Sequence, residues 1–190
     1  FQTQRMELYK QYAEQLVESG HAYRCYASAE EIAEQRAAYE KEHGKKGFRF
    51  RSPWRDRTDG DPNEKHSIRF KTPLEGQVTW DDLLRGEITV DNREQQDFVL
   101  LRGNGLPLYN FGCVVDDMTM DISLVARGDD HIVNTPPQIL LYRAFGKEPP
   151  RFAHLPMVLG PDGKKLSKRH AAVSVLEYRD LGYLPDAVIN

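Results

Sequence analysis

The sequence predicts an α/β fold, and three features of the chain indicate it. Short stretches in which apolar and polar residues alternate, such as HSIRFKTP, GQVTW and EITV, are typical of strands. The segment NTPPQILLYRAFG has the opening prolines, apolar spacing and closing glycine of a helix. Because this helix lies between the strand-like DISLVAR and the apolar run HLPMVLG, the order of elements predicts a βαβ unit.

Two helices are predicted in the first 44 residues. Apolar side chains recur every four positions from Gln4 to Ser19, and Gly20 follows as the stop. A second helix should begin at Ser28, because Glu31 stands three residues later, which is the spacing of a capping box. It should end near Gly44. Since it carries few large apolar side chains, we expect it to lie on the surface.

The middle of the chain predicts short strands and turns. DFVLLRGNGLPLYNF should form two extended runs joined by a turn at residues 102–105, and FGCVVDDM after it predicts a helix. Alternation places two groups of apolar side chains each on one side of a strand: Ile68 with Phe70, and Ile122 with Leu124 and Ala126.

The helix of the βαβ unit has start and stop signals of its own. Thr135 is in position to be its N-terminal cap, Pro136 falls in the first turn and Gly146 ends it. The apolar run from His154 to Gly160 should then be the second strand. The interior side chains of the helix should be Ile139, Leu140 and Tyr142.

Composition predicts an ordinary soluble globular protein. The chain has 190 residues, 39% of them hydrophobic and 29% charged, with a formal net charge of −3, which excludes a disordered or strongly basic protein. No apolar run approaches the ~18 residues of a membrane span, and no signal-peptide pattern opens the chain. The two cysteines, Cys25 and Cys113, favour a reducing compartment over a disulfide framework. We therefore expect a cytoplasmic protein with no membrane partner.

Helical patterns run directly from Phe1 and stop abruptly after Val188. We therefore expect the chain to be a piece excised from a longer protein.

The loop GPDGKKLSKRH concentrates positive charge, since four of the six residues from Lys164 to Arg169 are cations. One interpretation is a solvated basic turn. The other is a phosphate site, in which Lys165, Ser167 and Lys168 meet the negative charge of a polyphosphate. The glycine spacing of a Walker loop is absent.

Arg127 stands at the end of the DISLVAR strand, where a planar guanidinium could hold a substrate carboxylate or pair with Asp129 or Asp130 on the surface. Tyr109 in LYNF could bind a ligand through its hydroxyl or be a packed aromatic residue.

The segment KKGFRFRSPWRDR mixes cations with aromatic rings, which suits either a flexible charged loop or contact with RNA. The cations that we assign to RNA are Lys45, Lys46, Arg49, Arg51 and Arg55.

Metal binding and acid–base chemistry have weaker signals. Cys25 has His21 and His43 nearby but no second cysteine at ligand spacing, so we expect no zinc or other metal site. The acidic pairs at 116–117 and 129–130 could be acid–base groups, but capping and solvation suit them better.

Three segments occur in a set order: LPLYNFGCVVDD, VARGDDHIVNTPPQILLYRAFG and FAHLPMVLGPDGKKLSKRH. In this order and spacing they resemble bacterial-type glutamyl-tRNA synthetases. The resemblance implies the second half of a Rossmann-type class I catalytic domain with an α+β insertion that binds the tRNA acceptor stem. The implied segments are a catalytic-domain helix (1–20), the insertion (21–105), the second Rossmann half (106–154) and the signature-loop region (155–190).

The same resemblance implies roles for individual residues. Lys165, Ser167, Lys168 and Arg169 match the catalytic Lys-Met-Ser-Lys-Ser signature, in which Lys168 corresponds to the lysine that binds ATP. Tyr109 and Arg127 match glutamate-binding positions. The family's other signature, His-Ile-Gly-His, is absent from the sequence.

The resemblance further implies a glutamate–tRNA ligase whose partners are tRNA(Glu), L-glutamate and ATP with Mg²⁺, without zinc. We expect it to be a monomer, and we expect the isolated piece to be inactive. Two alternatives stay open, a relative that glutamylates the modified base queuosine in tRNA(Asp), and a non-catalytic tRNA-binding paralogue.

Overall fold

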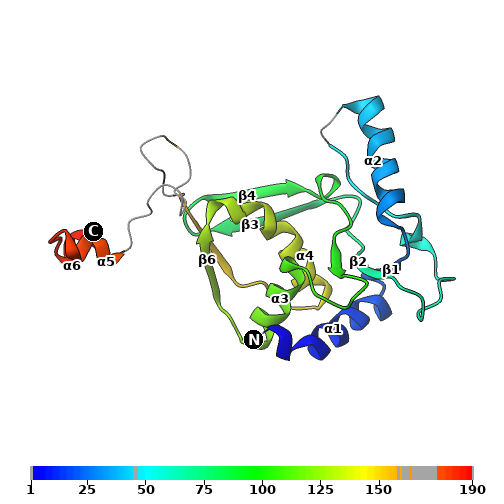
Figure 1. Cartoon of the computed structure of the whole chain (residues 1–190), viewed down its shortest axis with the longest axis horizontal. Coiled ribbons are helices and arrows are strands. Elements are labelled where there is room, and N and C mark those ends of the chain that lie inside the picture. Colours follow the sequence, from blue (N-terminus) through cyan, green and yellow to red (C-terminus); the bar gives the residue numbers. More distant parts are fainter. Residues whose placement is uncertain (1, 45–46, 158, 160–162, 164–174, 190) are drawn as a thin grey trace.

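The structure of the chain is a computed structural model that describes residues 2–44, 47–157, 159, 163 and 175–189 (Figure 1). The predicted α/β class is confirmed. The α-helices are α1 (Met6–Glu18), α2 (Ala29–His43), α3 (Tyr109–Thr119), α4 (Thr135–Ala144), α5 (Val175–Asp180) and α6 (Pro185–Ile189). The strands are β1 (Ala22–Cys25), β2 (Ser67–Phe70), β3 (Gln77–Asp82), β4 (Gly86–Asp91), β5 (Val99–Leu101), β6 (Leu124–Gly128) and β7 (Arg151–Leu155). Short 3₁₀ turns are η1 (Gln2–Gln4), η2 (Pro53–Asp56), η3 (Asn92–Glu94) and η4 (Asp129–Asn134).

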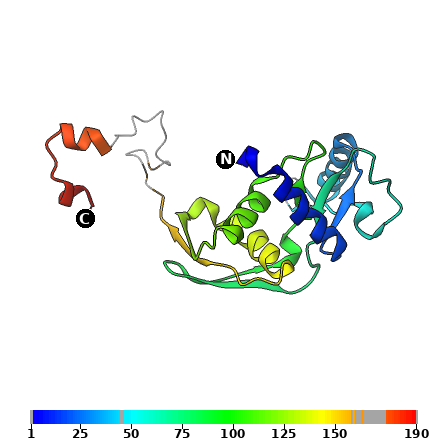
Figure 2. The same ribbon diagram turned by 90° about the horizontal axis from the view of Figure 1, so that it is seen from below.

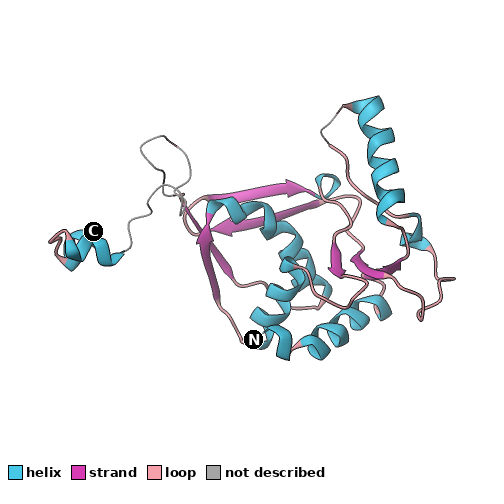
Figure 3. Cartoon of the chain, in the orientation of Figure 1, coloured by secondary structure: helices cyan, strands magenta, loops and turns pink. Residues whose placement is uncertain are grey.

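The strands form two sheets (Figure 3). A three-stranded antiparallel sheet has the order β1-β2-β5, and a four-stranded mixed sheet has the order β4-β3-β7-β6. In the second sheet β3 and β4 are an antiparallel hairpin, whereas β7 runs parallel to both β3 and β6. The predicted βαβ unit is therefore present as β6, α4 and β7. Three parallel strands end at the same edge of this sheet.

Helices α3 and α4 lie on one face of the four-stranded sheet (Figure 2). The apolar residues that β6 was predicted to place on one side do not face these helices. Leu124 is 39% exposed and Ile122, just before the strand, is 36% exposed, whereas Val125, the residue after Leu124, packs against the core. Alternation along the strand therefore holds, but the inward face is the one that carries Val125.

The two N-terminal helices agree with their sequence signals. Gly20 and Gly44 follow the helices with φ angles of +77° and +82°, values that glycine adopts without strain. At the start of α2 the Ser28 hydroxyl accepts a hydrogen bond from the Glu31 N–H, and the Glu31 carboxylate accepts one from the Ser28 N–H. This capping box satisfies backbone donors at the start of a helix that buries no residue.

Three local predictions are corrected. The second extended run after the turn at 102–105 reduces to one bridge between Leu101 and Pro107. The strand expected from His154 onward is β7, which begins at Arg151. Phe152 already pairs with β6 and is buried. Thr135 is the first residue of α4 but not its cap, and its hydroxyl bonds Arg127 instead.

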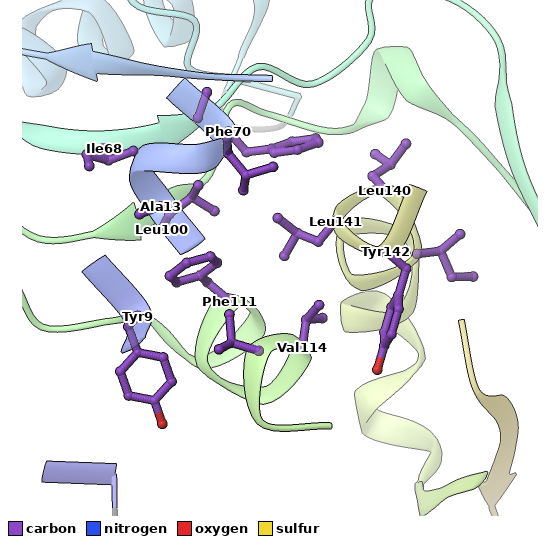
Figure 4. Packing of buried hydrophobic residues seen from close by; sticks show 14 of the residues in the cluster. Tyr9, Ala13, Ile68, Phe70, Leu100, Phe111, Val114, Leu140, Leu141 and Tyr142 are labelled. Carbon is purple, nitrogen blue, oxygen red and sulfur yellow. The ribbon is translucent and has the colours of Figure 1, made fainter. Parts of the chain in front are cut away.

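One hydrophobic cluster joins most of the chain. Figure 4 shows side chains from α1, α3 and α4 meeting around Leu100, Phe111 and Leu141. The cluster includes residues from the predicted insertion, such as Phe70 and Val78, together with Phe152 of β7. Moreover, the β3–β4 hairpin lies within residues 21–105 yet pairs with β7. The division into an insertion and a catalytic domain stays a prediction.

A second, smaller cluster contains Tyr23, Cys25 and Phe50. Both cysteines are free thiols, and Cys25 is buried with its sulfur 3.3 Å from the Ser52 hydroxyl. Within the described part of the chain, no helix is long and apolar enough to cross a membrane.

Replacing Leu141 tests the main cluster. Leu141 is fully buried, so Leu141→Ala should lower the free energy of unfolding by about 2–5 kcal/mol, because burial is lost and a cavity remains. Denaturant unfolding measures the change. Leu74→Ala is the matched control, since Leu74 is 52% exposed, and it should change stability by about 0.5 kcal/mol or less. Equal effects of the two changes would contradict the proposed packing.

Candidate functional site

Three polar residues stand at the carboxyl ends of the three adjacent parallel strands. Asp82 is the last residue of β3, and Arg127 and His154 are register partners near the ends of β6 and β7. Crevices at this edge of an α/β sheet are where such folds bind ligands. The strand register therefore brings together side chains that are far apart in the sequence.

The Arg127 guanidinium is held by two neighbours. Its Nε donates to His154 Nε2 at 3.1 Å, and its Nη2 donates to the Thr135 hydroxyl at 2.8 Å. The Thr135 hydroxyl lies 3.2 Å from the same imidazole nitrogen. The pairing of Arg127 with Asp129 that the sequence left open is not found. Asp129 instead binds Arg85, at 2.7 Å.

Asp82 holds the other side of the imidazole. Its Oδ2 lies 2.5 Å from His154 Nδ1, and both side chains are fully buried. Its Oδ1 accepts the backbone N–H groups of His154, Leu84 and Arg85 at 3.1–3.2 Å. Burial acts to raise the pKa of Asp82, but the hydrogen bonds from His154 and the backbone outweigh it and lower the pKa overall. Asp82 is thus an ionised carboxylate with its acceptor sites filled.

Tyr109 lies within electrostatic range of Arg127. It is the first residue of α3 and 49% exposed, and its hydroxyl is 3.4 Å from His131 Nδ1. Burial raises the pKa of the Tyr109 hydroxyl and the nearby Cys113 adds to this, whereas the Arg127 guanidinium opposes both. The Arg127 guanidinium is therefore near enough to favour the ionised form of the Tyr109 hydroxyl. The structure brings together the two residues that the sequence assigned to one substrate.

Helix α3 presents a row of polar groups at this place. Tyr109, Cys113 and Asp117 are spaced by four residues and so lie on one side of the helix. Burial raises the pKa of Asp117, the neighbouring Asp116 adds to it and Arg127 opposes it. Asp116 itself points elsewhere and accepts hydrogen bonds from Arg5 and Tyr9 at 2.8 Å each. Asp116 thus links α3 to the N-terminal helix, whereas Asp117 lies on the side of α3 that carries Tyr109.

A hollow of about 420 Å³ borders Tyr109. Its wall includes Arg36 of α2 and Arg69 of β2, together with Asn110 of α3 and Asn134. Apolar side chains such as Phe50, Phe98 and Leu108 complete the lining, so the hollow is mixed in character.

The cations proposed for RNA contact have different surroundings. Arg49 donates to the backbone carbonyls of Phe48 and Glu94, and Arg51 donates to that of Gln95 at 3.0 Å. Arg55 is paired with the buried Asp97 and also donates to the Thr72 carbonyl at 2.6 Å. Arg55 therefore stabilises the fold, and its assignment to RNA stays a prediction.

Several predicted site residues lie outside the described residues. These are Lys45 and Lys46 of the cationic segment, and Lys165, Ser167, Lys168 and Arg169 of the signature loop. Their placement relative to Arg127 stays a prediction.

Among the residues that the structure describes, no group of three or more histidine, cysteine or acidic side chains could hold a metal ion. The expectation that the protein lacks zinc stays a prediction.

Sequence reasoning missed Asp82, Thr135 and His154 as parts of the site. Asp82 lies two residues after the strand-like GQVTW, and His154 opens an apolar run. A signal was available for His154, because polar residues at the carboxyl ends of parallel strands gather at one edge.

The comparisons with known proteins agree with this architecture. Residues 1–190 match the family described as tRNA synthetases class I (E and Q), catalytic domain. The chain belongs to this family, and its sheet with three parallel strand ends is part of that catalytic fold.

Two relatives are glutamate–tRNA ligases. The chain is 52% identical over 190 residues to the glutamate–tRNA ligase of Anaeromyxobacter sp. (strain K) and 52% identical to glutamate–tRNA ligase 2 of Coxiella burnetii (strain Dugway 5J108-111). In each comparison the match covers all of this chain and 40% of the relative. The chain thus spans less than half the length of these curated relatives.

A solved structure is also similar. It is the glutamate tRNA ligase of Elizabethkingia meningosepticum CCUG26117 in complex with its amino acid, with a TM-score of 0.80 and 30% identity. The match covers 99% of this chain and 43% of that one.

Replacing Arg55 tests its structural role. Asp97 is fully buried, so Arg55→Ala leaves a buried carboxylate without its cation and should lower the free energy of unfolding by about 3–5 kcal/mol. Denaturant unfolding measures the loss. Arg93→Ala is the control, because Arg93 forms an exposed pair with Asp91, and its unfolding midpoint should stay close to that of the unchanged protein. A small effect of Arg55→Ala would leave its guanidinium available for RNA.

The raised pKa of Asp117 has a measurable consequence. A raised pKa means that the folded state binds the proton more tightly than the unfolded state, so stability increases as pH falls through that pKa. Asp117→Asn removes the ionised carboxylate and should be more stable than the unchanged protein at pH 7. The difference should shrink toward about pH 4, near the ordinary pKa of an aspartate. Urea unfolding at both pH values measures this, with the exposed Asp121→Asn as control. A pH-independent difference would contradict the argument.

Proposed function

We propose that this chain forms part of a glutamate–tRNA ligase, which activates glutamate with ATP and transfers it to the 3′ end of tRNA(Glu). The observation that carries the proposal is the position of Arg127 near the carboxyl end of β6, within electrostatic range of the Tyr109 hydroxyl. A cationic fork beside a phenol suits a ligand that carries carboxylates. The glutamate–tRNA ligases to which the chain is similar support the choice of glutamate.

Activation begins with attack of a glutamate carboxylate oxygen on the α-phosphorus of ATP. The bond from that phosphorus to the bridging oxygen breaks, and pyrophosphate leaves with Mg²⁺. A ribose hydroxyl at the tRNA 3′ end then attacks the acyl carbon, and AMP leaves. Arg127 and Tyr109 would orient glutamate during the first step, which converts binding energy into alignment of the reacting atoms.

The signature loop would meet the phosphates. Lys165 and Lys168 carry positive charge toward the pyrophosphate as its negative charge grows, and Lys168 is the ATP ligand. Ser167 would donate a hydrogen bond to the loop or to a phosphate. Arg169 adds a further cation. ATP enters as its Mg²⁺ complex, and we propose no other metal.

Acceptor-stem binding is assigned to the cationic segment, led by Lys45, Lys46, Arg49 and Arg51. Such contacts release counterions from the phosphate backbone, so binding weakens as salt increases. The ligase would act in the cytoplasm as a monomer. The isolated chain would be inactive, since it lacks a His-Ile-Gly-His sequence to complete the ATP site.

Pyrophosphate exchange in a full-length protein containing this chain tests the proposal. Glutamate-dependent exchange should occur, and Lys168→Ala should slow it by about 100- to 1,000-fold because charge stabilisation in the transition state is lost. The glutamate concentration at half-maximal rate should change little. Lys10→Ala is the control, since Lys10 lies on the exposed side of α1 and should leave the rate unchanged.

Two outcomes would contradict the proposal. Exchange that does not depend on glutamate would contradict glutamate as the substrate. Exchange that Lys168→Ala leaves unchanged would contradict the role assigned to Lys168. Glutamylation of a base in tRNA(Asp), in place of the 3′ end of tRNA(Glu), would point to the queuosine-type relative.

A further inference from the structure

We propose that His154 is a positioning residue, a neutral imidazole with its proton on Nδ1 that fixes the Arg127 guanidinium in the plane in which it receives the substrate carboxylate. Asp82 selects this form of the imidazole. The identity of the substrate as glutamate rests on the proposed function, whereas the state of the imidazole does not.

The hydrogen bonds determine which nitrogen carries the proton. An arginine guanidinium has only donors, so the contact of 3.1 Å from Arg127 Nε requires an acceptor at His154 Nε2. Nε2 therefore carries no proton. A neutral imidazole then has its N–H at Nδ1, where Asp82 Oδ2 accepts it at 2.5 Å.

A doubly protonated imidazole does not fit this arrangement. It would place an N–H at Nε2 opposite the Arg127 N–H, two donors facing each other without an acceptor. It would also bring a second cation against the guanidinium in a fully buried position. In the order carboxylate, neutral imidazole and guanidinium, each hydrogen-bond donor faces an acceptor.

This contact fixes the direction of the guanidinium. Nε donates a hydrogen bond to His154 and Nη2 donates one to Thr135, so two hydrogen bonds fix the plane of the guanidinium. The Phe152 ring, 5.7 Å from the guanidinium carbon, stacks with the imidazole and adds a third contact. A carboxylate must therefore approach the remaining N–H groups of Nη1 and Nη2. Arginine otherwise has large rotamer freedom, which would be lost on binding.

The positioning role can be separated from the structural role of the same network. Asp82 Oδ1 accepts three backbone N–H groups, which hold the turn after β3 and the strand β7 without the imidazole. The contact from Nε2 to Arg127 adds nothing to those bonds. Changes at Nε2 should thus affect the substrate more than the fold.

Two substitutions of His154 distinguish the two nitrogens. The amide of His154→Asn occupies the place of Nδ1 and keeps a donor toward Asp82, but it leaves Arg127 without its acceptor. The longer His154→Gln places its amide oxygen near Nε2 and restores that acceptor. In full-length protein, His154→Asn should raise KM for glutamate by about 10- to 100-fold, as expected when a hydrogen bond to a charged group is lost. His154→Gln should recover most of the loss.

The KM for ATP should stay within about twofold in both variants, because His154 Nε2 contacts Arg127 and Thr135, and Arg127 is assigned to glutamate. Thr135→Val removes the acceptor for Nη2 with little change of shape, and it should also raise KM for glutamate. It serves as the second variant if His154→Asn fails to fold. His21→Asn, at an exposed histidine, is the matched control and should leave both constants unchanged.

Equal increases for glutamate and ATP, or a glutamate KM that neither His154→Asn nor Thr135→Val changes, would overturn the proposal. Nitrogen-15 spectra of histidine-labelled full-length protein give a readout that needs no activity, with the His154 signal assigned by its loss in His154→Gln. A proton on Nδ1 is expected, and a proton on Nε2 would overturn the proposal. If the unchanged protein shows no glutamate-dependent exchange, the proposed function fails, and the spectra still decide the state of the imidazole.

Discussion

The carboxylate of Asp82 is the group on which the site depends. A buried charge is costly unless hydrogen bonds surround it, and Asp82 meets this condition with the His154 side chain and three backbone N–H groups. These partners belong to the β3–β4 turn and to β7. One carboxylate thus joins the hairpin to the parallel strands, while the imidazole that it orients contacts Arg127.

A second buried carboxylate does comparable work in the smaller sheet. Asp97 accepts hydrogen bonds from the Tyr23 hydroxyl at 2.9 Å and the Thr72 N–H at 3.1 Å, and it pairs with Arg55. Both carboxylates are buried where strands from distant parts of the chain meet, and hydrogen bonds hold those strands together there. The hydrophobic clusters give each region its stability, and these ionic groups determine which strand ends adjoin.

Local signals predicted much of the fold, and contacts between distant residues explain what they missed. The capping box of Ser28 and Glu31 and the glycine stops are chemistry between neighbours, so the sequence contains them in full. Thr135 had the position of a cap, but its hydroxyl is engaged by Arg127 from another strand. The inward side of β6 depends on which helices cover it. Arg127 and Tyr109 were candidates from their places in the sequence, and the resemblance assigned both to glutamate, while His154 and Asp82 have no local pattern that links them.

The hydrogen bonds of Asp82 to His154 also bear on the order of folding. The two residues are separated by 72 positions. During synthesis at about 5–20 residues per second, roughly 4–14 s pass between their appearance. The β3–β4 hairpin pairs with itself and can form within that interval, but its parallel partner is not yet available. Because the contact requires closure of a long loop, we expect the junction of Asp82 with His154 to form after the local hairpin.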